Sequence, residues 1–232
     1  MAGATRTPLP WLKPAVLTGS LVPVAAIVLR ASQNELGADP IAQALNQLGL
    51  IALVFLVAAL ACTPLKAIAG WTWPMRVRRM LGLLAFFYAS LHVTTYALID
   101  QGLDWHAIEA DILKRKFIFV GFATFVLLVP LAATSTNAAL RRLGFVRWKQ
   151  LHRIAYLAAA LAVIHFTWRV KRDVREPVTY GLILASLLAA RAVVYLRTRT
   201  IQWRQGLRRR AAETGRPRFP NWSLPFRFGR ER

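Results

Sequence analysis

The stretch LGLIALVFLVAALACTPL, residues 48–65, contains no charged side chain. An α-helix rises about 1.5 Å per residue, so a run of about 18–20 apolar residues crosses the ~30 Å hydrocarbon core of a bilayer. The run lacks the alternation of polar and apolar residues that membrane β-barrel strands show. In lipid, backbone N–H and C=O groups must pair within the segment, which favours a helix. We therefore expect a transmembrane helix here.

Five more apolar runs flank this one, separated by short polar connections. Of the 232 residues, 56% are hydrophobic, and the mean hydropathy is +0.40. The six predicted segments are residues 14–29, 48–68, 80–99, 117–133, 151–168 and 178–196. The predicted fold class is therefore all-α, a polytopic membrane helix bundle with about six transmembrane helices.

The first segment has the basic start and apolar middle of a signal peptide. Pro23 interrupts it, however, and no small-residue cleavage site precedes the next polar stretch. We expect it to be retained as a membrane helix. The predicted organisation is a cytoplasmic N-terminus (1–13), a six-helix transmembrane domain (14–196) and a basic cytoplasmic tail (197–232).

Lysine and arginine in the connections predict the orientation. The connections after the second and fourth segments are basic, whereas those after the first and third carry acidic residues. The positive-inside rule thus places both termini in the cytoplasm. The connection after the fifth segment opposes this assignment, because it places Arg169, Lys171, Arg172 and Arg175 on the outer side.

A formal net charge of +21 raises the question of nucleic acid binding. Most basic residues lie beside apolar runs rather than on one soluble face, so we expect no nucleic acid partner. The tail has eleven arginines, which suits contact with anionic lipids of the bilayer. Cys62 is the only cysteine, which excludes an intramolecular disulfide and a thiolate cluster.

Three of the four histidines, His92, His152 and His165, lie in or at the end of apolar segments. Ionisable side chains there indicate a functional site, although a histidine can also form a hydrogen bond between helices. His92 lies ~18 Å along its segment, and His165 lies ~20 Å beyond His152. His92 and His165 are therefore predicted at similar depth in the outer half of the bilayer, where they could ligate one iron. His152 is predicted at the inner surface, too far from His165 to share that iron.

A haem suits these histidines better than a bare ion. Zinc or copper would recruit carboxylates or thiolates, which the third and fifth segments lack. Haem iron with two histidines needs neither. Small residues at 158–160 leave room beside the fifth segment. His106 follows Asp100 and Gly102, so we interpret it as an exposed loop histidine.

Basic residues surround His152 at the predicted inner surface. Arg147, Lys149 and Arg153 would suit haem propionates or a flavin phosphate, which favour paired cationic donors. They could equally be determinants of topology alone.

Four stretches together resemble the MsrQ (YedZ) family. They are RRMLGLLAFFYASLHVTTYAL (78–98), TSTNAALRRLGFVRWKQLHRIAYLAAALAVIHFTW (134–168), LGADP (36–40) and TPL (63–65). The likeness covers roughly residues 10–197 in order, and the basic tail is not part of it. His92, His152 and His165 match the family's motifs, whereas His106 matches no ligand position of the family.

The resemblance implies a ferric-reductase-like transmembrane fold and a b-type cytochrome of the bacterial inner membrane. It implies one haem b with room for a second, and FMN at a site that these residues do not locate. Such proteins pass electrons from the quinone pool to MsrP, a periplasmic molybdopterin enzyme that reduces methionine sulfoxide in oxidised proteins.

Larger relatives among ferric reductases and NADPH oxidases carry a cytoplasmic flavin–nicotinamide module. Residues 197–232 contain no glycine-rich nucleotide fingerprint, so electrons are expected from quinol or from a separate flavin reductase. Two alternatives stay open. One is a stand-alone ferric or metalloreductase-like haem protein, and the other is a structural anchor whose histidines only join helices.

Overall fold

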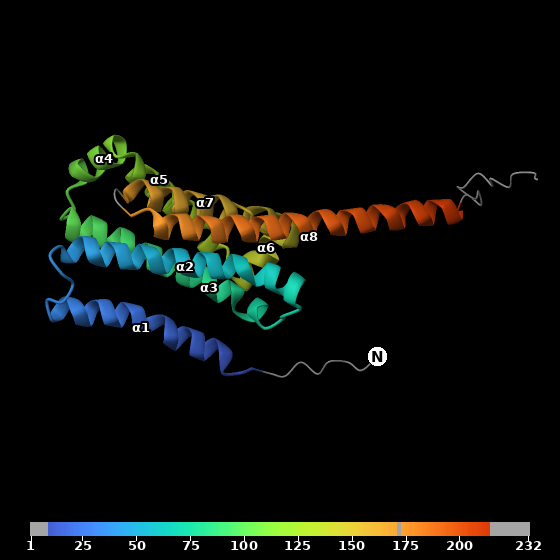
Figure 1. Cartoon of the computed structure of the whole chain (residues 1–232), viewed down its shortest axis with the longest axis horizontal. Helices are drawn as coiled ribbons and strands as arrows, with labels where there is room; N and C mark the ends of the chain where they lie inside the picture. The colour runs from blue at the N-terminus through green and yellow to red at the C-terminus, as the bar shows by residue number, and fades with distance from the viewer. Residues whose placement is uncertain (1–8, 171–172, 214–232) are drawn as a thin grey trace, which may run out of the picture. The chain divides into compact units, whose positions relative to one another are not determined.

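A computed structural model describes residues 9–170 and 173–213 of the chain. Every regular element in these ranges is helical (Figure 1). The elements are α1 (Leu12–Ser32), α2 (Pro40–Ala69), α3 (Pro74–Thr95), the π-helical turn η1 (Tyr96–Asp100), α4 (Trp105–Lys114), α5 (Lys116–Ala133), α6 (Asn137–Leu151), α7 (Ile154–Arg169) and α8 (Arg175–Glu213). The predicted all-α fold is confirmed.

Five helical stretches are long and apolar enough to cross a membrane. They are α1, α2, α3 together with η1, α5, and α8 as far as Leu207. The pair α6 and α7 adds a sixth if it is counted as one broken span, bent by 43°. The prediction of about six membrane helices therefore agrees with the structure.

Helix α2 is longer than the apolar run that predicted it. Asp39 caps its first turn by accepting a hydrogen bond from the Ala42 N–H at 3.0 Å, and Pro40 occupies the first helical position. The helix ends at Gly70, whose φ of 70° is the left-handed conformation that glycine adopts readily. The additional N-terminal turns of α2 belong to the site described below.

The connection between the third and fourth segments is not an open loop, as predicted, but contains helix α4. The Asp104 side chain begins it by accepting hydrogen bonds from the N–H groups of His106 and Ala107, at 3.0 and 3.1 Å. His106 is exposed, as expected, but it lies in the first turn of this helix. Helix α4 has only ten residues, which is too short for a prediction based on the length of apolar runs.

The predicted loop before the fifth segment is also helical. Thr136 caps α6 by accepting a hydrogen bond from the Ala139 N–H at 3.0 Å, and Gly144 interrupts the helix with a φ of 74°. Residues 152 and 153 form the break before α7, so His152 follows α6 instead of opening a continuous helix. The predicted basic tail is helical as far as Glu213, and residues 1–8 and 214–232 lie outside the described ranges.

Two helix pairs organise the bundle: α2 packs along α3, and α5 packs along α7. The main core cluster joins all four helices and α8 through Leu56, Leu60, Ala85, Leu128, Leu131, Ala158, Ala159 and Leu184. Both core clusters lie in the first of two units, Met1–Ala190 and Arg191–Arg232, into which contacts divide the chain.

Tyr88 connects α1 to this arrangement. It is completely buried, its ring stacks on Phe55 with centroids 5.6 Å apart, and its hydroxyl donates to the backbone oxygen of Ser20. A polar group inside an apolar bundle needs such a partner. The contact fixes α1 against α3 near the middle of both helices.

Replacing Ala158 by leucine tests the close approach of α7 to its neighbours. Ala158 is completely buried, so we expect the added methylenes to destabilise the fold by about 1–3 kcal/mol through overpacking. Thermal unfolding followed by circular dichroism in detergent micelles measures the change. Ala185→Leu on α8 is the matched control, because Ala185 is exposed. Equal losses in both variants would contradict the proposed packing.

Candidate functional site

His92 on α3 and His165 on α7 face each other inside the bundle. Their ring centroids are 6.3 Å apart, and the ring planes are inclined at 85°. The two residues are separated by 73 positions in the sequence, and both side chains are partly buried. The structure therefore brings together the two histidines that the depth argument paired.

Each of these imidazoles is held by a backbone carbonyl of a neighbouring helix. The Nδ1 of His92 lies 2.8 Å from the Leu45 oxygen on α2, and the Nδ1 of His165 lies 2.6 Å from the Phe117 oxygen on α5. A carbonyl only accepts, so each Nδ1 carries the proton and each Nε2 keeps its lone pair. This is the tautomer in which histidine binds a metal through Nε2.

A glycine makes room for each imidazole. A Cβ built on Gly49 would lie 3.2 Å from Nδ1 of His92, and one built on Gly121 would lie 2.7 Å from Nδ1 of His165. Real Cβ contacts essentially never fall below 3.0 Å, so an alanine at position 121 would force the ring to move. The absence of a side chain at Gly49 and Gly121 is therefore part of the site.

The same local device is used twice. Gly49 follows Leu45 by four residues on α2, and Gly121 follows Phe117 by four residues on α5. Residues four apart lie on one face of a helix, so the accepting carbonyl and the space for the ring occur together. Sequence reasoning missed these four residues. An isolated glycine in an apolar helix was the available signal, since glycine costs helix stability.

A cavity of about 570 Å³ surrounds the two histidines. This volume lies within the range of small-molecule sites. Its walls come from α2, α3, η1, α4, α5 and α7, and they are mainly apolar. The apolar wall includes Leu50, Leu53, Leu56, Ala89, Val93, Ile108, Ile112, Ile118, Phe122, Phe125, Leu128 and Ala162.

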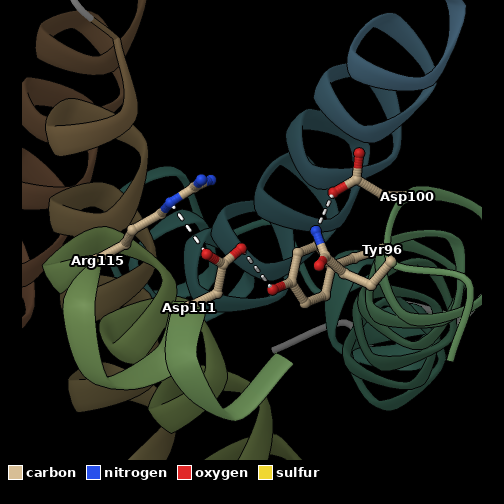
Figure 2. Close-up of polar contacts among 5 residues, drawn as sticks. Tyr96, Asp100, Asp111 and Arg115 are labelled. Atoms are coloured by element: carbon tan, nitrogen blue, oxygen red, sulfur yellow. Dashed lines mark hydrogen bonds and ion pairs between the residues drawn. The ribbon is translucent and has the colours of Figure 1, made fainter. Parts of the chain in front are cut away.

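Charged and polar groups gather where η1, α4 and the start of α5 meet (Figure 2). The Tyr96 hydroxyl donates to Asp111 at 3.2 Å, and Asp111 forms an ion pair with Nε of Arg115 at 3.1 Å. Asp100 accepts a hydrogen bond from the Gln101 side chain at 2.9 Å. Asp100, Arg115 and Arg169 supply the charged side chains of the cavity wall.

The distance between the two imidazoles fits an iron held by two histidines. Metal–nitrogen bonds of about 2.0–2.1 Å require the two ligating nitrogens to be roughly 4 Å apart. The ring centroids, at 6.3 Å, exceed this by about one ring radius on each side. In residues 9–170 and 173–207, no three side chains of His, Cys, Asp or Glu come close enough to share a metal ion. Two histidines suffice when a porphyrin supplies the equatorial ligands.

His152 lies apart from this pair and does not line the cavity. Its ring stacks on Trp148 with centroids 3.9 Å apart. Its Nδ1 lies 3.0 Å from the Trp148 oxygen, and its Nε2 lies 3.5 Å from the Ser135 hydroxyl. The predicted basic cluster is exposed at Arg147, Lys149 and Arg153. The structure thus separates His152 from His92 and His165, as the depth argument predicted.

Comparison with known proteins identifies the family. Residues 47–163 match the family model described as ferric reductase like transmembrane component. Among curated proteins, the chain is 49% identical over 185 residues to the protein-methionine-sulfoxide reductase heme-binding subunit MsrQ of Rhodospirillum rubrum, covering 80% of this chain and 89% of that protein.

Two further relatives bear the same name. The protein from Deinococcus radiodurans is 47% identical over 184 residues, which are 79% of this chain and 91% of that protein. The protein from Brucella ovis is 45% identical over 207 residues, which are 86% and 93% respectively. The chain therefore belongs to the MsrQ family of ferric reductase-like transmembrane proteins.

Proposed function

We propose that this protein is a b-type cytochrome subunit that holds a haem between His92 and His165 and passes electrons through the membrane to a methionine sulfoxide reductase. One observation carries the proposal: two histidines whose Nδ1 atoms lie at hydrogen-bond distance from backbone carbonyls face each other in a mainly apolar cavity, with ring centroids 6.3 Å apart. The names of the relatives, which describe a heme-binding subunit, support it.

The bound haem would supply one-electron chemistry, since its iron alternates between ferric and ferrous states. His92 and His165 would hold the haem iron through their Nε2 atoms. The hydrogen bonds to the carbonyls of Leu45 and Phe117 keep the proton on Nδ1 and orient each ring, and they also raise the basicity of Nε2. The apolar wall excludes water and lowers the local dielectric, which affects the redox potential.

We place the protein in the bacterial inner membrane with both termini in the cytoplasm, as the basic connections after the second and fourth segments predict. Residues 14–196 would form the haem-binding membrane domain and residues 197–232 the basic tail. Electrons would come from the quinone pool or from a cytoplasmic flavin reductase. The acceptor would be a periplasmic molybdopterin enzyme of the MsrP type, which repairs oxidised periplasmic proteins.

The surroundings of His152 remain a candidate for further cofactor binding. The match of His152 to the family's motifs supports a second haem or an FMN at the cytoplasmic side, next to Arg147, Lys149 and Arg153. The stacking of His152 on Trp148 occupies one face of the imidazole, so a ligand there would approach from elsewhere.

Replacing either His92 or His165 by alanine tests the ligand pair. We expect each variant to lose the haem, or to convert it from a low-spin to a high-spin form, because one axial ligand is missing. Optical and electron paramagnetic resonance spectra of the purified protein measure this. His106→Ala is the control, since His106 is exposed and does not line the cavity. An unchanged low-spin signal in both variants would refute the pairing.

Alanine substitutions at the two glycines test the fit of the rings. Gly121→Ala should lower the haem content more than Gly49→Ala, since the added Cβ would lie 2.7 Å from one imidazole but 3.2 Å from the other. The haem-to-polypeptide ratio measures the difference. Gly82→Ala on α3 is the control, because nothing lies within 4 Å of its Cβ position. Full haem content in Gly121→Ala would show that the rings do not occupy these positions.

The partner assignment is tested by reoxidation of the reduced haem. We expect fast reoxidation when an oxidised MsrP-type enzyme and a methionine sulfoxide substrate are added, and slower reoxidation at high salt. The reason is that the proposed outer surface combines acidic residues in 35–40 and 100–114 with basic residues in 169–176, so that charge steers association.

Stopped-flow absorbance at several ionic strengths measures this rate. Rates that do not depend on salt would remove the electrostatic steering. If the haem is reoxidised by a ferric chelate but not by the sulfoxide reductase, the stand-alone metalloreductase replaces the proposed function.

A further inference from the structure

Two arginines line the cavity beside the histidine pair. Arg169 ends α7 four residues after His165, so the two side chains lie on the same face of that helix. Arg115 precedes α5 and lies two residues before Phe117, whose carbonyl holds His165. Arg169 is thus close in sequence to His165 itself, and Arg115 is close in sequence to the residue whose carbonyl holds His165.

Arg169 is a partly buried cation without a carboxylate at ion-pair distance in the described part of the chain. Its guanidinium carbon lies 5.9 Å from the centroid of the Phe166 ring, and its side chain lines the same cavity as His92 and His165. A charge taken out of water next to apolar walls is stabilised by an anion. This arrangement points to an anionic group within the cavity.

Arg115 is placed to bind a second anionic group. Its ion pair with Asp111 is formed through Nε. The guanidinium has four further N–H donors on its two terminal nitrogens, which can bind another anion. Asp111 is fixed in turn by the Tyr96 hydroxyl (Figure 2). The Arg115 side chain is 57% exposed, compared with 16% for Asp111, so the arginine lies at the mouth of the cavity.

We propose that Arg169 and Arg115 bind the two propionate carboxylates of the porphyrin whose iron lies between His92 and His165. This inference rests on the proposed haem function and adds the orientation of the macrocycle, whose propionate edge would face η1 and α4. Arginine is the side chain best suited to carboxylates, because its planar fork donates two parallel hydrogen bonds. Asp100 also lines this end of the cavity. Its negative charge would repel a propionate, so the propionates would lie closer to Arg169 and Arg115.

The inference also accounts for Arg169, one of the four cations that oppose the positive-inside rule in the connection after the fifth segment. Arg169 and Arg115 both fall on the predicted outer side, where the rule disfavours cations. A cation that binds an anion inside the protein does not act as a determinant of topology. Arg169 would therefore be retained for the cofactor, and its position would not argue against the proposed orientation.

The test measures the rate at which haem leaves the protein and enters apomyoglobin. We expect Arg169→Gln and Arg115→Gln to release haem roughly tenfold faster, as for the loss of one charge-assisted hydrogen bond. Both should also lower the midpoint potential, because removal of a nearby positive charge disfavours the ferrous state. The matched controls Arg175→Gln and Lys114→Gln remove a charge from exposed neighbours that do not line the cavity, and they should leave both quantities unchanged.

A modified cofactor shows whether the propionates are the groups bound. Apoprotein loaded with the dimethyl ester of iron protoporphyrin IX should release it faster than haem, and Arg169→Gln should then have no further effect. If Arg169→Gln accelerates release of the ester and of haem equally, the arginine does not bind propionate and the inference is wrong.

Because Arg115 also neutralises Asp111, the double variant Arg115→Gln with Asp111→Asn separates its two roles. Continued fast release from the double variant supports propionate binding, whereas restoration of the wild-type rate shows that Arg115 only balances Asp111. Wild-type protein that takes up no low-spin haem would instead overturn the proposed function. Normal low-spin haem with unchanged release in both arginine variants overturns this inference alone.

Discussion

An imidazole inside a membrane helix bundle has no water to accept a hydrogen bond from Nδ1, so the protein must supply the acceptor. Leu45 and Phe117 do so with backbone carbonyls, each on a helix that has a glycine one turn later. A carbonyl within a helix already accepts the bond of the helical ladder, but its second lone pair can take the imidazole proton. The rest of the bundle depends on keeping these two contacts in place.

The packing follows from this requirement. The histidine on α3 uses a carbonyl of α2, and the histidine on α7 uses a carbonyl of α5. These are also the two helix pairs with the most extensive contacts in the bundle. A glycine lets the paired helices approach, and the close approach brings the carbonyl within reach of the ring. The two halves of the site are then joined by the shared core around Ala85, Ala158 and Ala159.

Sequence reasoning identified the features that depend on composition and spacing. Apolar length predicted the membrane helices, and the depth of His92 and His165 along their segments predicted that they meet. The same reasoning did not predict the two helices whose first turns depend on a capping side chain. Asp104 begins α4 and Thr136 begins α6 in stretches too polar to be recognised as helices from apolar length. The sequence also did not predict which helices pack beside the two histidines. Gly49 and Gly121 could therefore not be assigned a role.

The break between α6 and α7 shows how one chain can hold two chemically different histidines. His165 lies within α7 and lines the cavity opposite His92. His152 lies in the break, where its Nδ1 meets the Trp148 carbonyl four residues before it, and Nε2 is near the Ser135 hydroxyl. The partner of its Nδ1 is local, whereas the carbonyls that accept from His92 and His165 lie on other helices. The hydrogen bond at Nδ1 of His152 therefore does not depend on a neighbouring helix. The orientations of His92 and His165, by contrast, depend on the packing of α2 against α3 and of α5 against α7.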